Sequence, residues 1–248
     1  MTGLLRAELL KIRSTRMWWG LLVGALVFVA IQVVALILVS GQQGAPSLDQ
    51  GSTVRTIWAS AGTGSTFALV LGILGMTTEY RHMTITATFL ATPRRGRVIA
   101  AKLVAHAAFG VVFGVAGAAL TAALAVPLLA MKGAPAIPTS TILQVLGAAV
   151  VGVAVYAVVG VGVGSFVRNQ VAAIVAALVW VFLVESLIIT LLPQVGKWLP
   201  GGAANAMMQA TSNRGSLLEP WAGGLLFLAY GLAFAALAAV TTQRRDIT

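Results

Sequence analysis

Six long apolar segments separated by short polar stretches dominate the hydrophobicity pattern of the chain. They run over residues 17–39, 57–76, 103–131, 142–167, 171–192 and 221–240. Each is near or above the ~20 residues that an α-helix, rising ~1.5 Å per residue, needs to cross ~30 Å of hydrocarbon. None alternates polar and apolar residues as the strands of a membrane barrel do. The pattern predicts an all-α integral membrane protein with six transmembrane helices in one domain over residues 1–248.

The segment before the first apolar run predicts an amphipathic helix over residues 4–16. Leu5, Leu9 and Ile12 share one face of such a helix, and the basic residues fall elsewhere. A helix of this kind can lie flat at the lipid headgroups. A basic topology signal with incidental amphipathicity is an equal alternative on periodicity alone.

Composition agrees with a membrane location. The 248 residues are 59% hydrophobic and 9% charged, which leaves too few polar side chains to cover a water-soluble globule. The net charge of +10 is spread over the ends of apolar segments, so it fits anionic headgroups better than nucleic acid. Cysteine is absent, and His82 and His106 stand alone, so no metal cluster is expected.

Lysine and arginine are distributed unevenly between the two sides that six spans define. One side carries Arg6, Lys11, Arg13, Arg16, Arg81, Arg94, Arg95, Arg97, Lys102, Arg168, Arg244 and Arg245, and the other carries Arg55, Lys132, Lys197 and Arg214. Cytoplasmic loops are enriched in these residues. The distribution therefore predicts that both termini and the loop 79–102 lie in the cytoplasm.

Two connections between spans differ from simple turns. Residues 79–102, EYRHMTITATFLATPRRGRVIAAK, hold several basic residues between two apolar runs, which indicates a docking surface. Residues 193–220 are mildly apolar and predict a short helix that dips into the outer interface.

Motifs for nucleotide chemistry are missing from the sequence. No G-x-x-x-x-G-K-[ST] occurs, so the chain is not expected to hydrolyse nucleotide by itself. The glycines Gly160, Gly162 and Gly164 lie inside an apolar run, where small residues let another helix approach closely. The same interpretation applies to Gly20 with Gly24 and to Gly110 with Gly114. Paired catalytic carboxylates are not evident.

Glu185 is an acid inside the fifth span, where a charged side chain near the bilayer centre costs ~2.5 to 3.5 kcal/mol. It either faces a cavity, binding cargo or taking a proton, or is bonded to a neighbouring helix or reaches the outer water. The second interpretation is preferred. Ser60 and Thr63 belong to a polar outer half of the second span, which either lines a translocation path or packs tightly on another helix.

The leader and the first inner loop also carry a recognisable pattern. RAELLKIRSTRMWW at the start is paired with E-Y-R-H-x-T-I-T-x-T-x-L-x-T-P-R-R-x-x-V-x-x-A-K after the second span. Together they resemble ABC-2 type permeases, the membrane subunits of bacterial ABC exporters, and the resemblance extends over essentially the whole chain. One departure is Met83, where the family pattern usually has Gly; a more rigid turn is implied.

The resemblance implies a type V exporter-like architecture in a bacterial inner membrane. Two permeases, identical or related, form a dimer, and two separate cytoplasmic ATPase subunits bind beneath, each holding a coupling helix in a groove. ATP and Mg would bind the ATPase, and no cofactor is expected on this chain. Membrane lipids are the remaining expected partners.

The resemblance also implies roles for particular residues. The candidates for ATPase coupling are Glu79, Arg81, Thr84, Thr88, Leu90, Pro93, Arg94 and Arg95. The candidates for the cargo path are Ser60, Thr63, Phe67 and Glu185.

The expected function is that of an exporter permease, whose cargo is a drug, antibiotic, peptide or lipid. The alternative is a non-transporting anchor or regulator that recruits a cytosolic partner through the loop 79–102. A lipid-modifying enzyme would need a convergent set of catalytic groups, and His, Asp and Glu are scarce. A secondary transporter would require more intramembrane charge than Glu185 provides.

Overall fold

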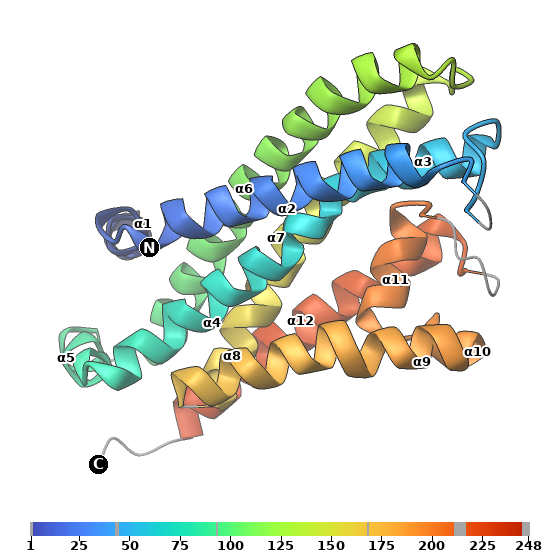
Figure 1. Ribbon diagram of the computed structural model, residues 1–248. Coiled ribbons are helices and arrows are strands. Elements are labelled where there is room, and N and C mark those ends of the chain that lie inside the picture. The colour runs from blue at the N-terminus through green and yellow to red at the C-terminus, as the bar shows by residue number, and fades with distance from the viewer. Residues whose placement is uncertain (1, 43–44, 93, 168, 211–216, 245–248) are drawn as a thin grey trace.

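The computed structural model describes residues 2–42, 45–92, 94–167, 169–210 and 217–244. Within these ranges every regular element is a helix, and the long helices run side by side as one bundle (Figure 1). The predicted all-α fold is confirmed.

Six helical segments of the described chain are long and apolar enough to cross a membrane, as the sequence predicts. They are α2 (Met17–Val39), α3 to α4 (Gly51–Arg81), α6 (Arg95–Met131), α7 (Thr139–Phe166), α8 to α9 (Gln170–Leu191) and α12 (Pro220–Arg244). Two of these segments begin six residues or more before the apolar runs, at Gly51 and at Arg95. Hydropathy locates the part of a helix that suits hydrocarbon, whereas backbone hydrogen bonding continues past it.

Two spans are not continuous α-helices. The second consists of α3 (Gly51–Ala59), the 3₁₀ turn η1 (Ser60–Gly64) and α4 (Ser65–Arg81). The fifth consists of α8 (Gln170–Val179), the π-helical segment η2 (Trp180–Glu185) and α9 (Ser186–Leu191). Such interruptions often mark functional positions in helices.

Two short helices lie crosswise to the spans at one end of the bundle (Figure 1). The first residues of α2 and the last residues of α12 lie at the same end. The two short helices are α1 (Thr2–Ser14) and α5 (Thr84–Ala91). The predicted leader helix is thus confirmed as a helix. Its Ile12 is buried, and Leu5 and Leu9 pack against the same hydrophobic cluster. The apolar face of α1 therefore contacts the protein itself, which explains its amphipathic pattern.

The opposite end carries the connection before the last span. It contains α10 (Pro193–Gly196) and α11 (Pro200–Met207), and α11 packs against α12. Gly202, Ala203 and Ala204 of α11 are buried, so the mildly apolar composition of this connection serves packing on the bundle. Residues 211–216 of the same connection lie outside the described ranges.

Helix α7 is central to the bundle and packs against α4, α6 and α12. A Cβ atom on Gly160 would overlap the carbonyl oxygen of Leu69 in α4, and one on Gly72 would overlap the carbonyl oxygen of Ala157. The two backbones are therefore in direct contact, as small residues permit in membrane helices.

The other glycines of the predicted packing set behave alike with one exception. Gly162 faces Phe234 of α12, Gly164 faces Ile73 of α4, Gly110 and Gly114 face Ala154 and Val150 of α7, and Gly24 faces the ring of Phe67. The packing interpretation is confirmed for these positions. It is wrong within this chain for Gly20, which has open space where a Cβ would stand.

The close approach of α4 and α7 predicts opposite effects for two Gly→Ala substitutions on α7. Gly160→Ala should destabilise the fold by about 1–3 kcal/mol, because the added methyl meets backbone that cannot yield. Gly147→Ala, which meets open space, should be neutral or stabilising by up to about 1 kcal/mol through helix propensity. Thermal unfolding of the purified variants measures both, and equal melting temperatures would contradict the packing described.

Candidate functional site

The turn between α4 and α5 directs the chain across the end of the bundle. Met83 occupies this turn with φ 56°, in the left-handed region that favours glycine. Its side chain is exposed, so methionine at this position has the conformational energy cost of a left-handed backbone but no clash with a neighbouring residue. The position where the ABC-2 pattern usually has Gly is therefore one where the backbone conformation favours glycine.

Helix α5 and the residues that flank it include most of the positions that the resemblance marks for ATPase contact. Leu90 is 78% exposed, and Thr84 is exposed with its carbonyl oxygen accepting from the Thr88 hydroxyl at 3.1 Å. Arg81 and Arg94 are exposed on either side of the helix, and Arg95 begins α6 half-buried. Pro93 lies outside the described residues. These positions surround one short helix that has an exposed apolar side chain.

Glu79 belongs to the same predicted set but lies elsewhere. It is 7% exposed and belongs to a cluster of four ionisable side chains, here called the ionic cluster: the buried Glu8 of α1, Glu79 of α4 and Lys102 of α6, and the more exposed Lys11 of α1. The carboxylate of Glu79 thus pairs with lysines within this end of the bundle, and it is not part of the exposed face of α5.

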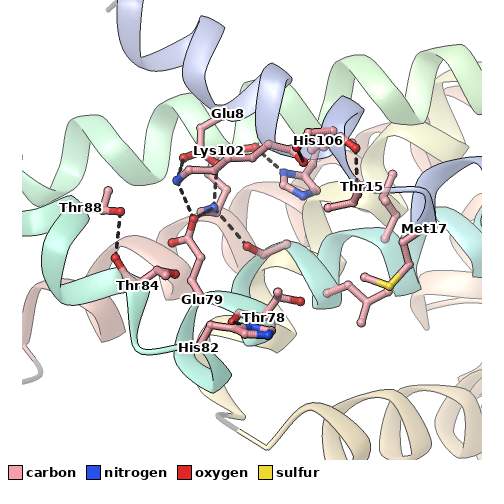
Figure 2. A pocket seen from close by; sticks show the side chains of 16 residues that line it. Glu8, Thr15, Met17, Thr78, Glu79, His82, Thr84, Thr88, Lys102 and His106 are labelled. Atoms are coloured by element: carbon pink, nitrogen blue, oxygen red, sulfur yellow. Dashed lines mark hydrogen bonds and ion pairs between the residues drawn. The ribbon is translucent and has the colours of Figure 1, made fainter.

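Lys102 is the centre of the ionic cluster (Figure 2). Its side chain is only 2% exposed, and its ammonium group donates to Glu8 Oε2 at 2.7 Å, to Glu79 Oε1 at 2.9 Å and to the carbonyl oxygen of Gly75 at 3.1 Å. All three protons of the ammonium group are therefore used. Lys11 bridges the same carboxylates, at 2.7 Å from Glu8 Oε1 and 2.7 Å from Glu79 Oε1.

The two carboxylates and two ammonium groups balance in charge. Burial alone would raise the pKa of Glu8, but the charge and hydrogen bonds of Lys102 and Lys11 outweigh it and hold that pKa below its ordinary value of 4.5. Burial would lower the pKa of Lys11, and its bonds to Glu79 and Glu8 raise it above 10.5. The stability contributed by Glu8 is thus present above pH 4.5 and is lost as pH falls below it; that of Lys11 is lost as pH rises beyond 10.5.

A cavity of about 390 Å³ adjoins the ionic cluster between α1, α4, α5 and α6 (Figure 2). His106 lines it while being 1% exposed. Its Nδ1 bonds the Lys102 carbonyl oxygen at 2.8 Å, and its Nε2 lies against Gly75, where a Cβ would overlap the ring. His106 therefore has the position of a packing residue at the contact of α4 and α6.

A second cavity, of about 320 Å³, lies between the second and fifth spans. Glu185 lines it at 2% exposure, and its Oε1 accepts a hydrogen bond from the backbone N–H of Gly201 in α11. Glu185 is thus bonded to a neighbouring helical segment, as the preferred interpretation expects. It also faces a cavity, as the other interpretation expects. Both interrupted segments, η1 and η2, contribute to the wall.

Of the four candidates for the cargo path, two line this cavity and two do not. Thr63 and Glu185 line it together. Phe67 lies behind the wall, with its ring centroid 6.1 Å from that of Phe28, which lines the cavity. Ser60 does not line it: its hydroxyl donates to the Thr56 carbonyl oxygen at 3.3 Å, and the residue is 4% exposed.

Comparison with known families agrees with this arrangement. Residues 4–184 match the family described as ABC-2 family transporter protein. The chain belongs to the ABC-2 transporter family.

The ABC-2 match covers the leader helix, α5 and four complete spans. It identifies the chain as a multi-pass membrane component of an ABC transporter, and the family implies association with an ABC ATPase subunit. A comparison with curated proteins gives no match.

Sequence reasoning on this ABC-2 chain missed the ionic cluster. A signal was present, because Glu8 stands three residues after Leu5 and four before Ile12, on the apolar face of the leader helix. An acid on a face that packs into protein requires a cationic partner. The identity of that partner could not be read, since Lys102 is 94 residues away in sequence.

The ionic cluster predicts unequal effects for its two lysines. Lys102→Met should destabilise the protein by about 3–5 kcal/mol, because it removes the buried partner of two carboxylates. Lys11→Met should cost less, because the Lys11 side chain is 44% exposed and water replaces part of its contacts. Thermal unfolding in one detergent compares the variants, and a larger loss for Lys11→Met would contradict the assignment of Lys102 as the centre.

Proposed function

We propose that the chain is the permease subunit of an ATP-driven exporter, whose separate ATPase subunits dock on the bundle end formed by α1 and α5. The observation that carries the proposal is the placement of α5. It leaves the second span through the turn at Met83, lies crosswise to the spans and exposes Leu90. A partner with a hydrophobic groove could bury this side chain.

The distribution of charge supports a cytoplasmic location for this end. Of the residues that the structure describes, the end with α1 and α5 carries Arg6, Lys11, Arg13, Arg16, Arg81, Arg94, Arg95, Arg97 and Lys102, and the opposite end carries Arg55, Lys132 and Lys197. Positive residues favour the cytoplasmic side. In this proposal the membrane is the inner membrane of a bacterium, and ATP and Mg bind the partner.

Force applied to α5 enters the spans through the turn at Met83 into α4. From the end of α4 it has two further routes, because the ionic cluster ties α4 to α1 and to α6. A conformational change in the ATPase can shift the permease only if the docked element has different contacts in the two states. The routes give α5 the connection that such coupling requires.

The cavity between the second and fifth spans is the proposed cargo site. It lies toward the end of the bundle opposite to α5, and α4 runs from the ionic cluster at Glu79 to Ser65 and Thr66 in the cavity wall. A second permease copy is proposed to pack beside the fifth span, whose Val171, Val175 and Phe182 are exposed. Movement of α4 would then change the cavity at the dimer interface.

Docking through Leu90 predicts a loss of partner binding on substitution. Leu90→Asp should lower the amount of ATPase that copurifies with the permease by at least about tenfold, since burying a leucine contributes about 1.5–3 kcal/mol. Quantitative pull-down of the permease, from membranes that also contain its ABC ATPase subunit, measures the effect.

Met131→Asp is the matched control, because Met131 is 83% exposed at the opposite end of α6. It should leave the copurified amount unchanged. Equal losses in the two variants would contradict docking on α5. Absence of any ATPase in the wild-type complex would favour the alternative of a non-transporting anchor.

A further inference from the structure

We propose that the cavity beside Glu185 binds an organic cation, and that the Glu185 carboxylate is its counter-ion. The inference rests on the proposed function, because it names the cargo class of that site. It is carried by the charge of the cavity wall, its aromatic rings and its size.

Among the described residues, one carboxyl group lines the cavity. Glu185 is the only ionisable acid or base that lines it apart from the phenol of Tyr156; its other polar members are hydroxyls and amides: Gln32, Thr63, Ser65, Thr66, Ser186, Thr190 and Asn205. No ion pair to Glu185 occurs in the described part of the chain, where its one hydrogen bond comes from Gly201. A buried carboxylate with this surrounding attracts a cation and rejects an anion.

The position of Gly201 keeps the carboxylate where a ligand can reach it. A Cβ at this position would stand 3.0 Å from the Glu185 carboxyl carbon, so α11 approaches the carboxylate with bare backbone. The Gly201 N–H occupies Oε1 and fixes the orientation of the group. The remaining acceptor positions of a carboxylate, which has about four in total, are available to a ligand.

Three aromatic side chains complete the environment for a cation. Phe28, Tyr156 and Phe182 line the cavity with Glu185. The rings of Phe28 and Phe182 meet edge to face, with centroids 6.4 Å apart and planes at 76°. Aromatic faces attract cations within about 6 Å, most strongly where water is excluded.

The volume limits the ligand. About 320 Å³ is at the lower end of the ~300–1,000 Å³ typical of small-molecule sites. The cavity of one copy therefore suits a compact amphiphilic cation. A protonated amine or a delocalised onium ion with aromatic groups has the required charge and apolar surface.

Tetraphenylphosphonium tests the inference on the full chain in lipid nanodiscs. Wild-type protein should bind it, and Glu185→Gln should weaken binding at least tenfold while neutral triphenylphosphine oxide binds wild type and variant equally. Equal binding of the neutral probe also confirms that the variant retains its cavity. Asp49→Asn is the matched control, because it removes one acidic charge from an exposed residue in the connection before α3; its affinity should stay within twofold of wild type.

Two results would overturn the inference: unchanged tetraphenylphosphonium affinity in Glu185→Gln, or wild-type binding of the neutral probe as tight as that of the cation. Should Glu185→Gln fail to fold, Glu185→Asp, which keeps the charge, must retain cation binding. Copurification of the ATPase is scored on the same preparations. Capture of the ATPase without cation binding refutes the cargo class alone, whereas cation binding without any ATPase refutes the exporter proposal and the assignment of the cation as cargo.

Discussion

Four mutually neutralising side chains hold the leader helix to the bundle, and the arrangement of this end depends on them. Lys102 is almost completely buried, so its charge is tolerated only while Glu8 and Glu79 accept its hydrogen bonds. Lys102 and these two partners come from three separate helices, α6, α1 and α4. Moving α1 or the end of α4 away from α6 would leave a buried charge without a partner, which is far more costly than sliding apolar surfaces. The ionic cluster thus makes three helix ends move as one unit.

Helix α4 connects this unit to the opposite half of the bundle. Its Glu79 end belongs to the ionic cluster, and its Ser65 end continues from η1 into the wall of the cavity that holds Glu185. Between these ends, Gly72 meets the backbone of α7 without any side chain in between. A contact between two backbones has little capacity to deform, so a displacement at one end is transmitted along the helix. Such a connection is what an ABC-2 permease needs if an ATPase is to act on cargo from a distance.

Much of the fold follows from local pattern. Apolar length predicts the six spans, and glycine spacing predicts the contacts at Gly160 and Gly164. The ionic cluster did not follow, because the partners of Glu8 are distant in sequence and no local rule pairs them. The cavity could be predicted only in part, for the same reason. Glu185 and Thr63 were separate candidates in the sequence, and they line one cavity only because of how the second and fifth spans pack. The π-helical segment that ends at Glu185 has no simple sequence signal.

In the proposed orientation, α5 and the ionic cluster face the cytoplasm, where an ATPase can reach them. The chain has no cysteine, so Leu90→Cys and Met131→Cys each introduce a single thiol at an exposed site on opposite ends of the bundle. A membrane-impermeant maleimide applied to intact cells, and then to inside-out vesicles, measures which end is outside. With the proposed orientation, Met131→Cys should react in intact cells and Leu90→Cys only in inside-out vesicles. Labelling of Leu90→Cys in intact cells would contradict it.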